Sequence, residues 1–422
     1  MRIAIIAVAY NRTESLRRLL QSIERADYPA EPVTLIVSVD KSDSDSVERM
    51  ADGYAWPHGE KRVARHERNL GLRAHMLSLG RYFDEFDALI VLEDDVTVAP
   101  AFYHFAQACV EKYYDDDRIA GISLYSFAAN YQTRLPFMPV KTQWDVYFMN
   151  CAQSWGQVWM KPSWQAFKAW YDGVGDCTTS QRDDFSGGHL PRCLGQWPRS
   201  SWLKYHTRYC IEHDKLFVYP YHSLSTNNAD PGVNHRGNAD TFFQASLLMT
   251  VQKEFLLPAG LRNRDPESGK PDSELGKPDP ESGKRDSLQG PACYDGFFQA
   301  RFMGCCLGIG EEELCVDLFS EKPASLFRHY VLTNRLLPFR VVRSFALQLR
   351  PVEMNIVCGR EGSELFLYDT TQAAPPPKAP DRYLAYAYFY QKGFYKARTM
   401  IGLRRSVKLL WEMVLSRLRS KV

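Results

Sequence analysis

The chain has 422 residues, enough for two domains with hydrophobic cores of their own. Its 52 lysines and arginines nearly balance 50 aspartates and glutamates, and the net charge of +2 excludes the bulk electrostatic attraction on which nucleic-acid binding depends. No apolar run approaches the roughly 20 residues of a membrane-spanning helix, and we expect neither a membrane span nor a signal peptide. The 10 cysteines are scattered without zinc-binding spacing, which indicates a reducing, cytoplasmic compartment.

Strands and helices alternate along the first hundred residues. Residues 1–10 and 33–39 predict buried strands, because these runs are short, apolar and rich in branched side chains. Between them, leucines and an isoleucine recur at helical spacing, and we expect a helix with Thr13 as its N-cap. A weaker strand at residues 61–65 leads into a second helix, and residues 88–92 predict another buried strand. This order predicts an α/β fold: a mostly parallel, Rossmann-like sheet with helices on both faces.

An acidic triplet follows the last of these strands. Glu93, Asp94 and Asp95 would repel one another unless a positive charge lay among them. A divalent cation is the obvious candidate, because Mg²⁺ and Mn²⁺ prefer carboxylate oxygens and use few protein ligands when a substrate phosphate supplies the rest. The alternative is a solvated turn that caps the next helix, which is expected near residues 99–101.

Polar side chains also follow the other predicted strands. Asn11 and Arg12 come after the first strand, Asp40 after the second, and Asn69 after the third. Ligands of open α/β sheets bind at the carboxyl ends of the strands. This clustering is what a nucleotide site at the edge of the sheet requires.

The first half of the chain resembles the bacterial, family-2-like glycosyltransferases of the GT-A fold, which are found with polysaccharide biosynthesis. Its pattern is also similar to that of the eukaryotic N-acetylglucosaminyltransferase I group. The resemblance is strongest as far as residue 159 and continues more weakly towards residue 250. Seven segments occur in the order of the family: residues 9–12, 37–40, 69–75, 91–95, 100–103, 120–123 and 154–159.

The resemblance implies an inverting, metal-dependent transfer of a sugar from a nucleotide-diphosphate donor. Asp95 would ligate the Mn²⁺ or Mg²⁺ ion that bridges the donor diphosphate. Glu93 and Asp94 would face hydroxyl groups of the donor sugar and ribose, and Asn11 and Arg12 would line the nucleotide pocket. A cation at this place stabilises the charge that develops on the departing phosphate.

Three further residues are assigned to donor binding with an alternative for each. Asp40 would accept a hydrogen bond from the base or the ribose, or would only end its strand through a turn. Asn69 and Gly71 would contact the donor, or would be turn residues, since Asn and Gly tolerate positive φ. We also expect a lid over the donor in residues 219–228 and the loop beyond them, which contains His235.

The acceptor and the catalytic base have weaker signals. The family places a Trp-Gly element beside the acceptor sugar, which here is Trp155 and Gly156; the alternative is a core aromatic under a loop. An inverting transferase needs a group that deprotonates the acceptor hydroxyl. Residues 197–205 align with a family stretch that carries acids but contain none. The base is therefore sought in Asp184 or Glu212, and Asp183, His213 and Asp214 are further candidates.

The second half of the chain has less specific patterns. Its last part, from residue 396, combines many lysines and arginines with a broad apolar face at helical spacing, which is typical of a helix on an anionic membrane surface or of a helix docked on its own protein. The predicted division is a GT-A domain at 1–260, a disordered low-complexity loop at 261–290, a small α+β accessory domain at 291–372, a Pro-rich linker at 373–380 and a basic amphipathic helical region at 381–422.

These patterns together predict a cytoplasmic, peripherally membrane-associated hexosyl- or N-acetylhexosaminyltransferase of bacterial surface polysaccharide biosynthesis. Its partners would be a nucleotide-sugar donor and a glycan or lipid-linked acceptor, and no nucleic acid. One alternative is a catalytically silent module that binds a nucleotide sugar or a glycan. A second is a nucleotidyltransferase, which would call for a glycine-rich loop after the first strand, where residues 9–12 have no glycine.

Overall fold

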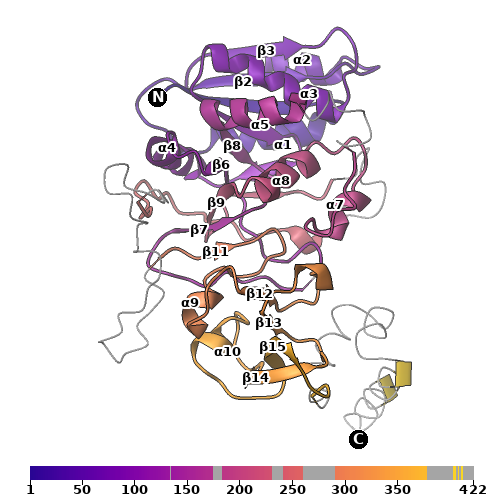
Figure 1. Cartoon of the computed structure of the whole chain (residues 1–422). Coiled ribbons are helices and arrows are strands. Elements are labelled where there is room, and N and C mark those ends of the chain that lie inside the picture. The colour runs from indigo at the N-terminus through magenta and orange to yellow at the C-terminus, as the bar shows by residue number, and fades with distance from the viewer. Residues whose placement is uncertain are drawn as a thin grey trace, which may run out of the picture. The chain divides into compact units, whose positions relative to one another are not determined.

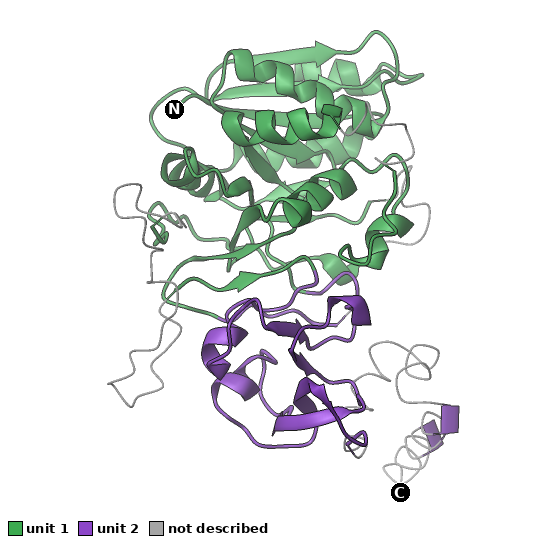
Figure 2. Ribbon diagram, in the orientation of Figure 1, with its two compact units in different colours: residues 1–128, 141–296 green, residues 129–140, 297–422 purple. Residues whose placement is uncertain are grey.

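The computed structural model divides the chain into two compact units (Figure 2). Unit 1 comprises residues 1–128 and 141–296, and unit 2 comprises residues 129–140 and 297–422. The structure describes residues 1–133, 135–173, 183–230, 241–259 and 290–377, together with Leu403, Arg404, Val407, Leu410 and Trp411. Residues 261–289, Gly232, His235 and nearly all of the C-terminal basic segment lie outside the described residues, and the predicted domain boundaries remain predictions.

A nine-stranded sheet forms the centre of unit 1. Strands β3, β2, β1 and β4 are parallel, and the antiparallel β8 joins β4 to the parallel pair β6 and β9. The order across the sheet is β11 (Cys293–Tyr294), β7 (Val146–Met149), β9 (Leu216–Pro220), β6 (Ile119–Ser123), β8 (Gln157–Met160), β4 (Ala88–Glu93), β1 (Ile3–Ala9), β2 (Thr34–Val39) and β3 (Lys61–Arg65). The predicted α/β fold with a mostly parallel central sheet is confirmed.

Helices cover both faces of this sheet (Figure 1). Their bounds in unit 1 are α1 (Thr13–Glu24), α2 (Ser46–Gly53), α3 (Leu72–Ser78), the 3₁₀ helix η1 (Leu79–Asp84), α4 (Phe102–Tyr113), α5 (Lys161–Gly173), α7 (Arg192–Gln196), α8 (Leu203–Glu212) and the 3₁₀ helix η2 (Thr241–Phe243). On one face, alternate residues of the strands pack with α1 and α4 in one hydrophobic core. On the other face, Trp159 of β8 stacks on Trp164 of α5, with ring centroids 4.1 Å apart.

Two local expectations were wrong. Helix α2 was not predicted, although Val47, Met50 and Ala51 follow helical spacing, because the helix is short and begins within a polar stretch that was assigned to a loop. The N-cap of α1 is Arg12, and no side chain forms a capping hydrogen bond. Thr13 is the first residue of the helix instead, and its hydroxyl donates to the Ser46 hydroxyl at 3.1 Å.

Unit 2 contains a smaller sheet of four strands with two short helices, which confirms the α+β accessory region. The sheet order is β12 (Leu314–Asp317), β13 (Tyr330–Thr333), β15 (Leu365–Ala373) and β14 (Phe339–Phe345), and the helices are α9 (Met303–Leu307), α10 (Met354–Val357) and the 3₁₀ helix η3 (Ala324–Leu326). Asp317 is buried at the end of β12 and pairs with Arg335 at 2.9 Å. Its carboxylate also accepts the amides of Glu321 and Lys322, so it stabilises the turn after β12.

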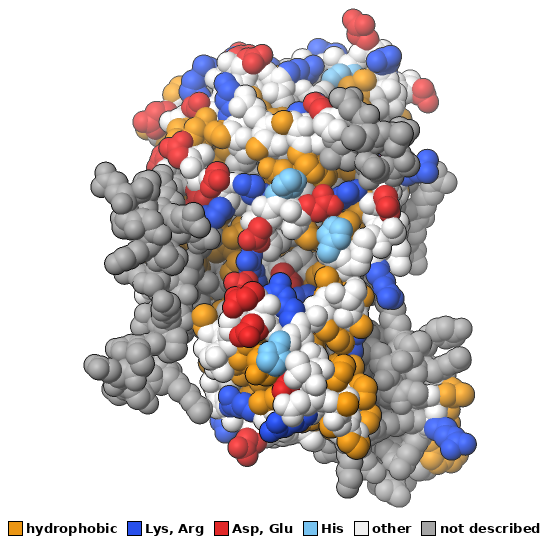
Figure 3. Space-filling model, viewed as in Figure 1, with side chains coloured by type: hydrophobic (Ala, Val, Ile, Leu, Met, Phe, Trp, Pro, Cys, Tyr) orange, Lys and Arg blue, Asp and Glu red, His pale blue; other side chains and the backbone are white. Residues whose placement is uncertain are grey.

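The distribution of charged side chains on the surface agrees with the nearly balanced charge of the sequence. On the face of unit 1 shown in Figure 3, acidic and basic side chains are interspersed and do not form separate fields. Within the described ranges, no helix is long and apolar enough to cross a membrane.

Candidate functional site

The register of the parallel strands brings their polar ends to one edge of the sheet. Ala9 is paired with Val39, and Val8 is paired with Glu93, so the chain leaves β1, β2 and β4 at nearly the same level. The amide of Asp40 still donates to the Ala9 carbonyl at 2.9 Å. Arg12, Asp40 and the acidic triplet therefore lie at the carboxyl edge, where ligands of such sheets bind.

The triplet is neither a solvated turn nor a helix cap. Asp94 is 4% exposed, and the short strand β5 (Val96–Val98) follows directly. Helix α4 begins only at Phe102, with Ala101 at its N-cap. Burial raises the pKa of the Asp94 carboxyl to about 6, against the opposing effect of Arg12. Burial and the charges of Asp95 and Asp94 also raise the pKa of Glu93 well above its ordinary value.

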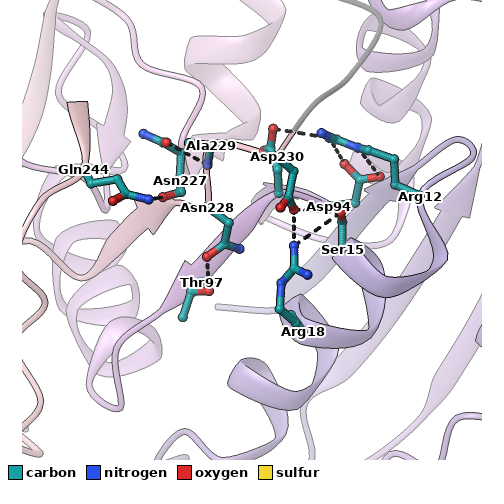
Figure 4. Close-up of polar contacts among 11 residues, drawn as sticks. Arg12, Ser15, Arg18, Asp94, Thr97, Asn227, Asn228, Ala229, Asp230 and Gln244 are labelled. Carbon is teal, nitrogen blue, oxygen red and sulfur yellow. Dashed lines mark hydrogen bonds and ion pairs between the residues drawn. The ribbon is translucent and has the colours of Figure 1, made fainter. Parts of the chain in front are cut away.

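Arg12 supplies the positive charge among these carboxylates (Figure 4). Its Nε donates to Asp94 Oδ2 at 3.2 Å, and its Nη2 donates to Asp94 Oδ1, so this pair is bidentate. The same Nη2 lies 3.2 Å from Asp95 Oδ2. Burial alone would lower the pKa of the guanidinium, but the two carboxylates outweigh burial and raise that pKa above its ordinary value.

Asp95 retains a carboxylate oxygen that could hold a cation. Its Oδ1 is buried and finds no hydrogen-bond partner in the part of the chain that the structure describes. No cluster of three or more His, Cys, Asp and Glu side chains is placed to hold a metal ion within the described ranges. Mg²⁺ and Mn²⁺ sites that substrate phosphates complete need only one or two carboxylates. The residues present therefore fit an ion that Asp95 holds together with a diphosphate.

Asp40 forms hydrogen bonds to the neighbouring backbone. Its buried carboxylate accepts the amides of Lys41 and Leu70 at Oδ1, both at 2.9 Å, and the amide of Gly71 at Oδ2, at 3.0 Å. Gly71 has φ +75° in open space, so its conformation is the reason for a glycine here. The side-chain amide of Asn69 donates to the Lys41 carbonyl at 2.9 Å. This is the geometry of the turn alternative, and a contact between these residues and a donor stays a prediction.

A segment from the distant part of unit 1 completes the edge. Strand β10 (Ser225–Asn227) pairs antiparallel with β5 and carries the following residues to the triplet. The Asn228 amide donates to the Asp95 carbonyl at 2.7 Å, and the Thr97 hydroxyl donates to Asn228 Oδ1 at 2.9 Å. Asp230 accepts hydrogen bonds from Ser15 and Arg18 of α1 (Figure 4). The only sequence signal for this segment was the expected lid at residues 219–228.

Trp155 and Gly156 lie in a tight loop before β8. The Trp155 ring packs edge-on against Tyr125, with centroids 4.9 Å apart, which is the core-aromatic geometry. Gly156 has φ +90°, and a Cβ there would lie 2.9 Å from Ser225 Oγ and 3.3 Å from Leu124 Cβ. The positive φ and the nearby Ser225 side chain together favour glycine at this position. A contact of Trp155 and Gly156 with an acceptor sugar stays a prediction.

The structure does not bring Asp184 and Glu212 together with the triplet. Asp184 is exposed and accepts the Ser186 amide at 2.9 Å, which lowers the pKa of its carboxyl. Glu212 is the last residue of α8 and pairs with Arg208 at 2.7 Å. It precedes β9, whose first residue, Leu216, pairs at the opposite edge of the sheet from the triplet.

The start of α8, by contrast, lies at the triplet. Trp202 directly precedes this helix, and its side chain is close enough to Glu93 to oppose the rise in the pKa of that carboxyl. One turn later, the Tyr205 hydroxyl donates to Asp183 and accepts from Arg73 Nη1 at 2.7 Å. Of the two adjacent aspartates, Asp183 is therefore the one that is bonded to the first turn of α8.

Comparisons with known proteins agree with the resemblance inferred from the sequence. Residues 1–118 match the family model described as "Glycosyltransferase like family 2". The resemblance is thereby confirmed for this part of the chain. A comparison with curated proteins gave no match.

Three solved structures show distant similarity to part of this chain. The S. aureus TarS fragment 1–349 in complex with UDP is 18% identical over 28% of this chain and 34% of its own, with a TM-score of 0.24. The mannosyltransferase PcManGT from Pyrobaculum calidifontis, in complex with GDP-Man and Mn²⁺, is 14% identical over 56% and 59%, with a TM-score of 0.33. GalNAc-T7 with UDP, GalNAc and Mn²⁺ is 17% identical over 53% and 43%, with a TM-score of 0.36. The chain thus spans about a third of the TarS fragment that it matches.

Proposed function

We propose that this chain transfers a hexosyl or N-acetylhexosaminyl group from a nucleotide-diphosphate donor, with inversion, to a glycan or lipid-linked acceptor of bacterial surface polysaccharide biosynthesis. The proposal includes Mn²⁺ or Mg²⁺ as cofactor and a cytoplasmic site of action at the inner face of the plasma membrane. The observation that carries it is the convergence of Arg12, Asp94 and Asp95 at the carboxyl edge of the parallel strands, within the residues that match the glycosyltransferase family.

The chemistry follows from the charges at this edge. Departure of a nucleoside diphosphate leaves negative charge on the outgoing phosphate, and a cation held by Asp95 would neutralise that charge. Arg12 is positioned by Asp94 to lie beside the same place. Trp202 lies close to Glu93 and thereby connects the triplet to the start of α8. The hydrogen bond between Asp183 and Tyr205, in the first turn of that helix, supports Asp183 as the carboxylate that receives the proton of the acceptor hydroxyl.

The donor site can be tested by thermal shift. UDP-, GDP- and dTDP-sugars are each added with Mn²⁺ or with EDTA, and CMP-sugars serve as nucleotide sugars without a diphosphate. Saturation of a single site at a hundred times Kd stabilises the folded state by about 2.7 kcal/mol, which a melting curve resolves. We expect one diphosphate class to stabilise the wild-type chain in Mn²⁺ but not in EDTA.

Two variants at the opposite ends of β4, just outside the strand, make this test specific. Asp95→Asn removes the charge of the expected metal ligand, and we expect it to abolish the Mn²⁺-dependent shift. Asp87 immediately precedes β4, at its opposite end, where its carboxylate accepts the Arg2 amide at 2.7 Å. Asp87→Asn is therefore a matched control that should retain the shift. Failure of every diphosphate sugar to stabilise the wild-type chain would refute the proposed function.

The silent binding module is the second candidate, because neither Asp184 nor Glu212 lies at the triplet. Release of nucleoside diphosphate from a bound donor distinguishes the two functions. Turnover supports the enzyme, and binding without turnover in the presence of glycan and lipid-linked acceptors supports the module.

A further inference from the structure

Arg12 occupies the position that a cation would need at the triplet. Its guanidinium contacts carboxylates of both Asp94 and Asp95, and all three side chains are largely shielded from solvent. Removal from water strengthens these interactions relative to an exposed ion pair. The protein therefore carries a cation of its own at the site where the proposed function requires a divalent ion.

The two contacts of Arg12 are unequal. Both oxygens of Asp94 accept hydrogen bonds from the guanidinium, which makes this pair bidentate. Asp95 contributes only Oδ2, at 3.2 Å, and its buried Oδ1 has no partner among the described residues. The pair with Asp94 is thus the anchor, and the contact with Asp95 is the one that can be given up.

We propose that Arg12 and the divalent ion compete for Asp95, and that Arg12 transfers to the donor diphosphate when the ion binds. This inference rests on the proposed function, and it adds a coupling between metal and nucleotide. A guanidinium and a divalent cation on one carboxylate repel each other at contact distance. A diphosphate offers Arg12 a new bidentate partner while Asp94 keeps the arginine in place.

The contacts around Asp95 hold its backbone, so the proposed transfer of Arg12 involves side chains alone. The backbone of Asp95 is held by the Asn228 amide, which donates to its carbonyl at 2.7 Å. A second arginine near this edge, Arg18, is paired with Asp230 and Ser15, neither of which belongs to the triplet. Arg12 is therefore the cation whose removal should alter metal binding at Asp95.

The experiment measures Mn²⁺ binding directly, from the electron paramagnetic resonance signal of the free ion. The wild-type chain, Arg12→Gln and Arg17→Gln are titrated alone and with UDP or GDP. Arg17 lies in α1, the helix that follows Arg12, and its contact within the described part of the chain is an exposed ion pair with Glu14, so it is the matched control. Binding of UDP or GDP in saturating Mn²⁺ is measured by calorimetry in parallel.

If Arg12 and the ion compete, Arg12→Gln should change Mn²⁺ affinity and nucleotide affinity in opposite directions. Without nucleotide, Arg12→Gln should bind Mn²⁺ about tenfold more tightly than the wild-type chain, within the usual range of coupling between sites. In saturating Mn²⁺, the same variant should bind the nucleoside diphosphate about tenfold more weakly, because the transferred arginine is missing. Arg17→Gln should behave as the wild-type chain in both titrations.

Other outcomes overturn the inference. Unchanged Mn²⁺ affinity in Arg12→Gln excludes competition, and a loss of both affinities indicates only a damaged site. If Arg12→Gln fails to fold, Arg12→Lys replaces it. A lysine cannot form the bidentate pair with Asp94 that fixes the cation beside Asp95, so it should raise Mn²⁺ affinity in the same direction. Adding Asp95→Asn to Arg12→Gln must abolish the increase in Mn²⁺ affinity. If the increase persists, the ion binds elsewhere and the inference fails. If neither UDP nor GDP binds the wild-type chain, the proposed donor site fails for these nucleotides, and the Mn²⁺ titration alone still decides the competition.

Discussion

The His206 imidazole on α8 is buried in an aromatic layer and should make the chain sensitive to mild acid. Its ring stacks on Phe167 at 4.3 Å and meets Phe217 edge-on at 5.1 Å. Neither ring nitrogen has a hydrogen-bond partner among the described residues. Burial lowers the pKa of His206 from 6.5 to about 3, because nothing stabilises the charged form.

The direction and size of the effect follow from this shift. Between pH 6.5 and pH 3 the unfolded chain binds a proton at this histidine and the folded chain does not, so stability falls as the pH falls through this window. At pH 5 the difference amounts to about 2 kcal/mol, and at pH 7.5 it is close to zero. His206→Phe removes the titration and keeps an aromatic ring against Phe167.

The assay is urea unfolding of unit 1, followed by tryptophan fluorescence at pH 7.5 and pH 5. The wild-type chain should lose about 2 kcal/mol more of its unfolding free energy between the two pH values than His206→Phe. Comparing the change with pH, instead of the stability at one pH, cancels any packing cost of the larger ring. His222, which is exposed, provides the control His222→Gln, whose pH dependence should match the wild-type chain. Equal pH dependence of the wild-type chain and His206→Phe would refute the reasoning.

Two further predictions concern the edge of the sheet. Asp183→Asn should lower release of nucleoside diphosphate by about 10²-fold, the usual size of a general-base effect, whereas Asp184→Asn should stay within about twofold. The reverse order would exclude Asp183 as the base. Gly156→Ala should lower the unfolding free energy by about 2 kcal/mol or more, because its Cβ would meet Ser225 Oγ at 2.9 Å at a positive φ. If adding Ser225→Ala restores part of the lost unfolding free energy, the contact with Ser225 Oγ is one cause of the loss. An unchanged melting temperature in Gly156→Ala alone would contradict the prediction.

The sequence predicted the elements whose signals are local. The apolar runs of β1, β2 and β4 and the acids that follow β4 are each visible in fewer than ten residues. Since parallel strands end at one edge, these signals sufficed to place Arg12, Asp40 and Asp95 together. The pairing of β5 with β10 could not be predicted, because strands of three residues show no period and the two are far apart in the chain.

The hydrogen-bond and ion-pair partners of the charged side chains could not be predicted from the sequence either. That Arg12 neutralises Asp94, and that Asp40 accepts three backbone amides, depends on the exact register of the strands and the path of the loops. The absence of acids from residues 197–205 directed the search for the base to other stretches, but it could not distinguish Asp183 from Asp184. Their different partners, Tyr205 and the Ser186 amide, become visible only in three dimensions.

The carboxylates at this edge differ in how much of their hydrogen-bonding capacity is still available. Asp40 uses both oxygens to fix the loop before α3, and Asp94 uses both to hold Arg12. Glu93 lies close to Trp202, and burial favours its protonated form. Asp95 alone among these four has a buried oxygen without a partner in the described part of the chain. A cation therefore has one available ligand at this edge, and the remaining coordination must come from the substrate or water, which is why metal and nucleotide binding should depend on each other.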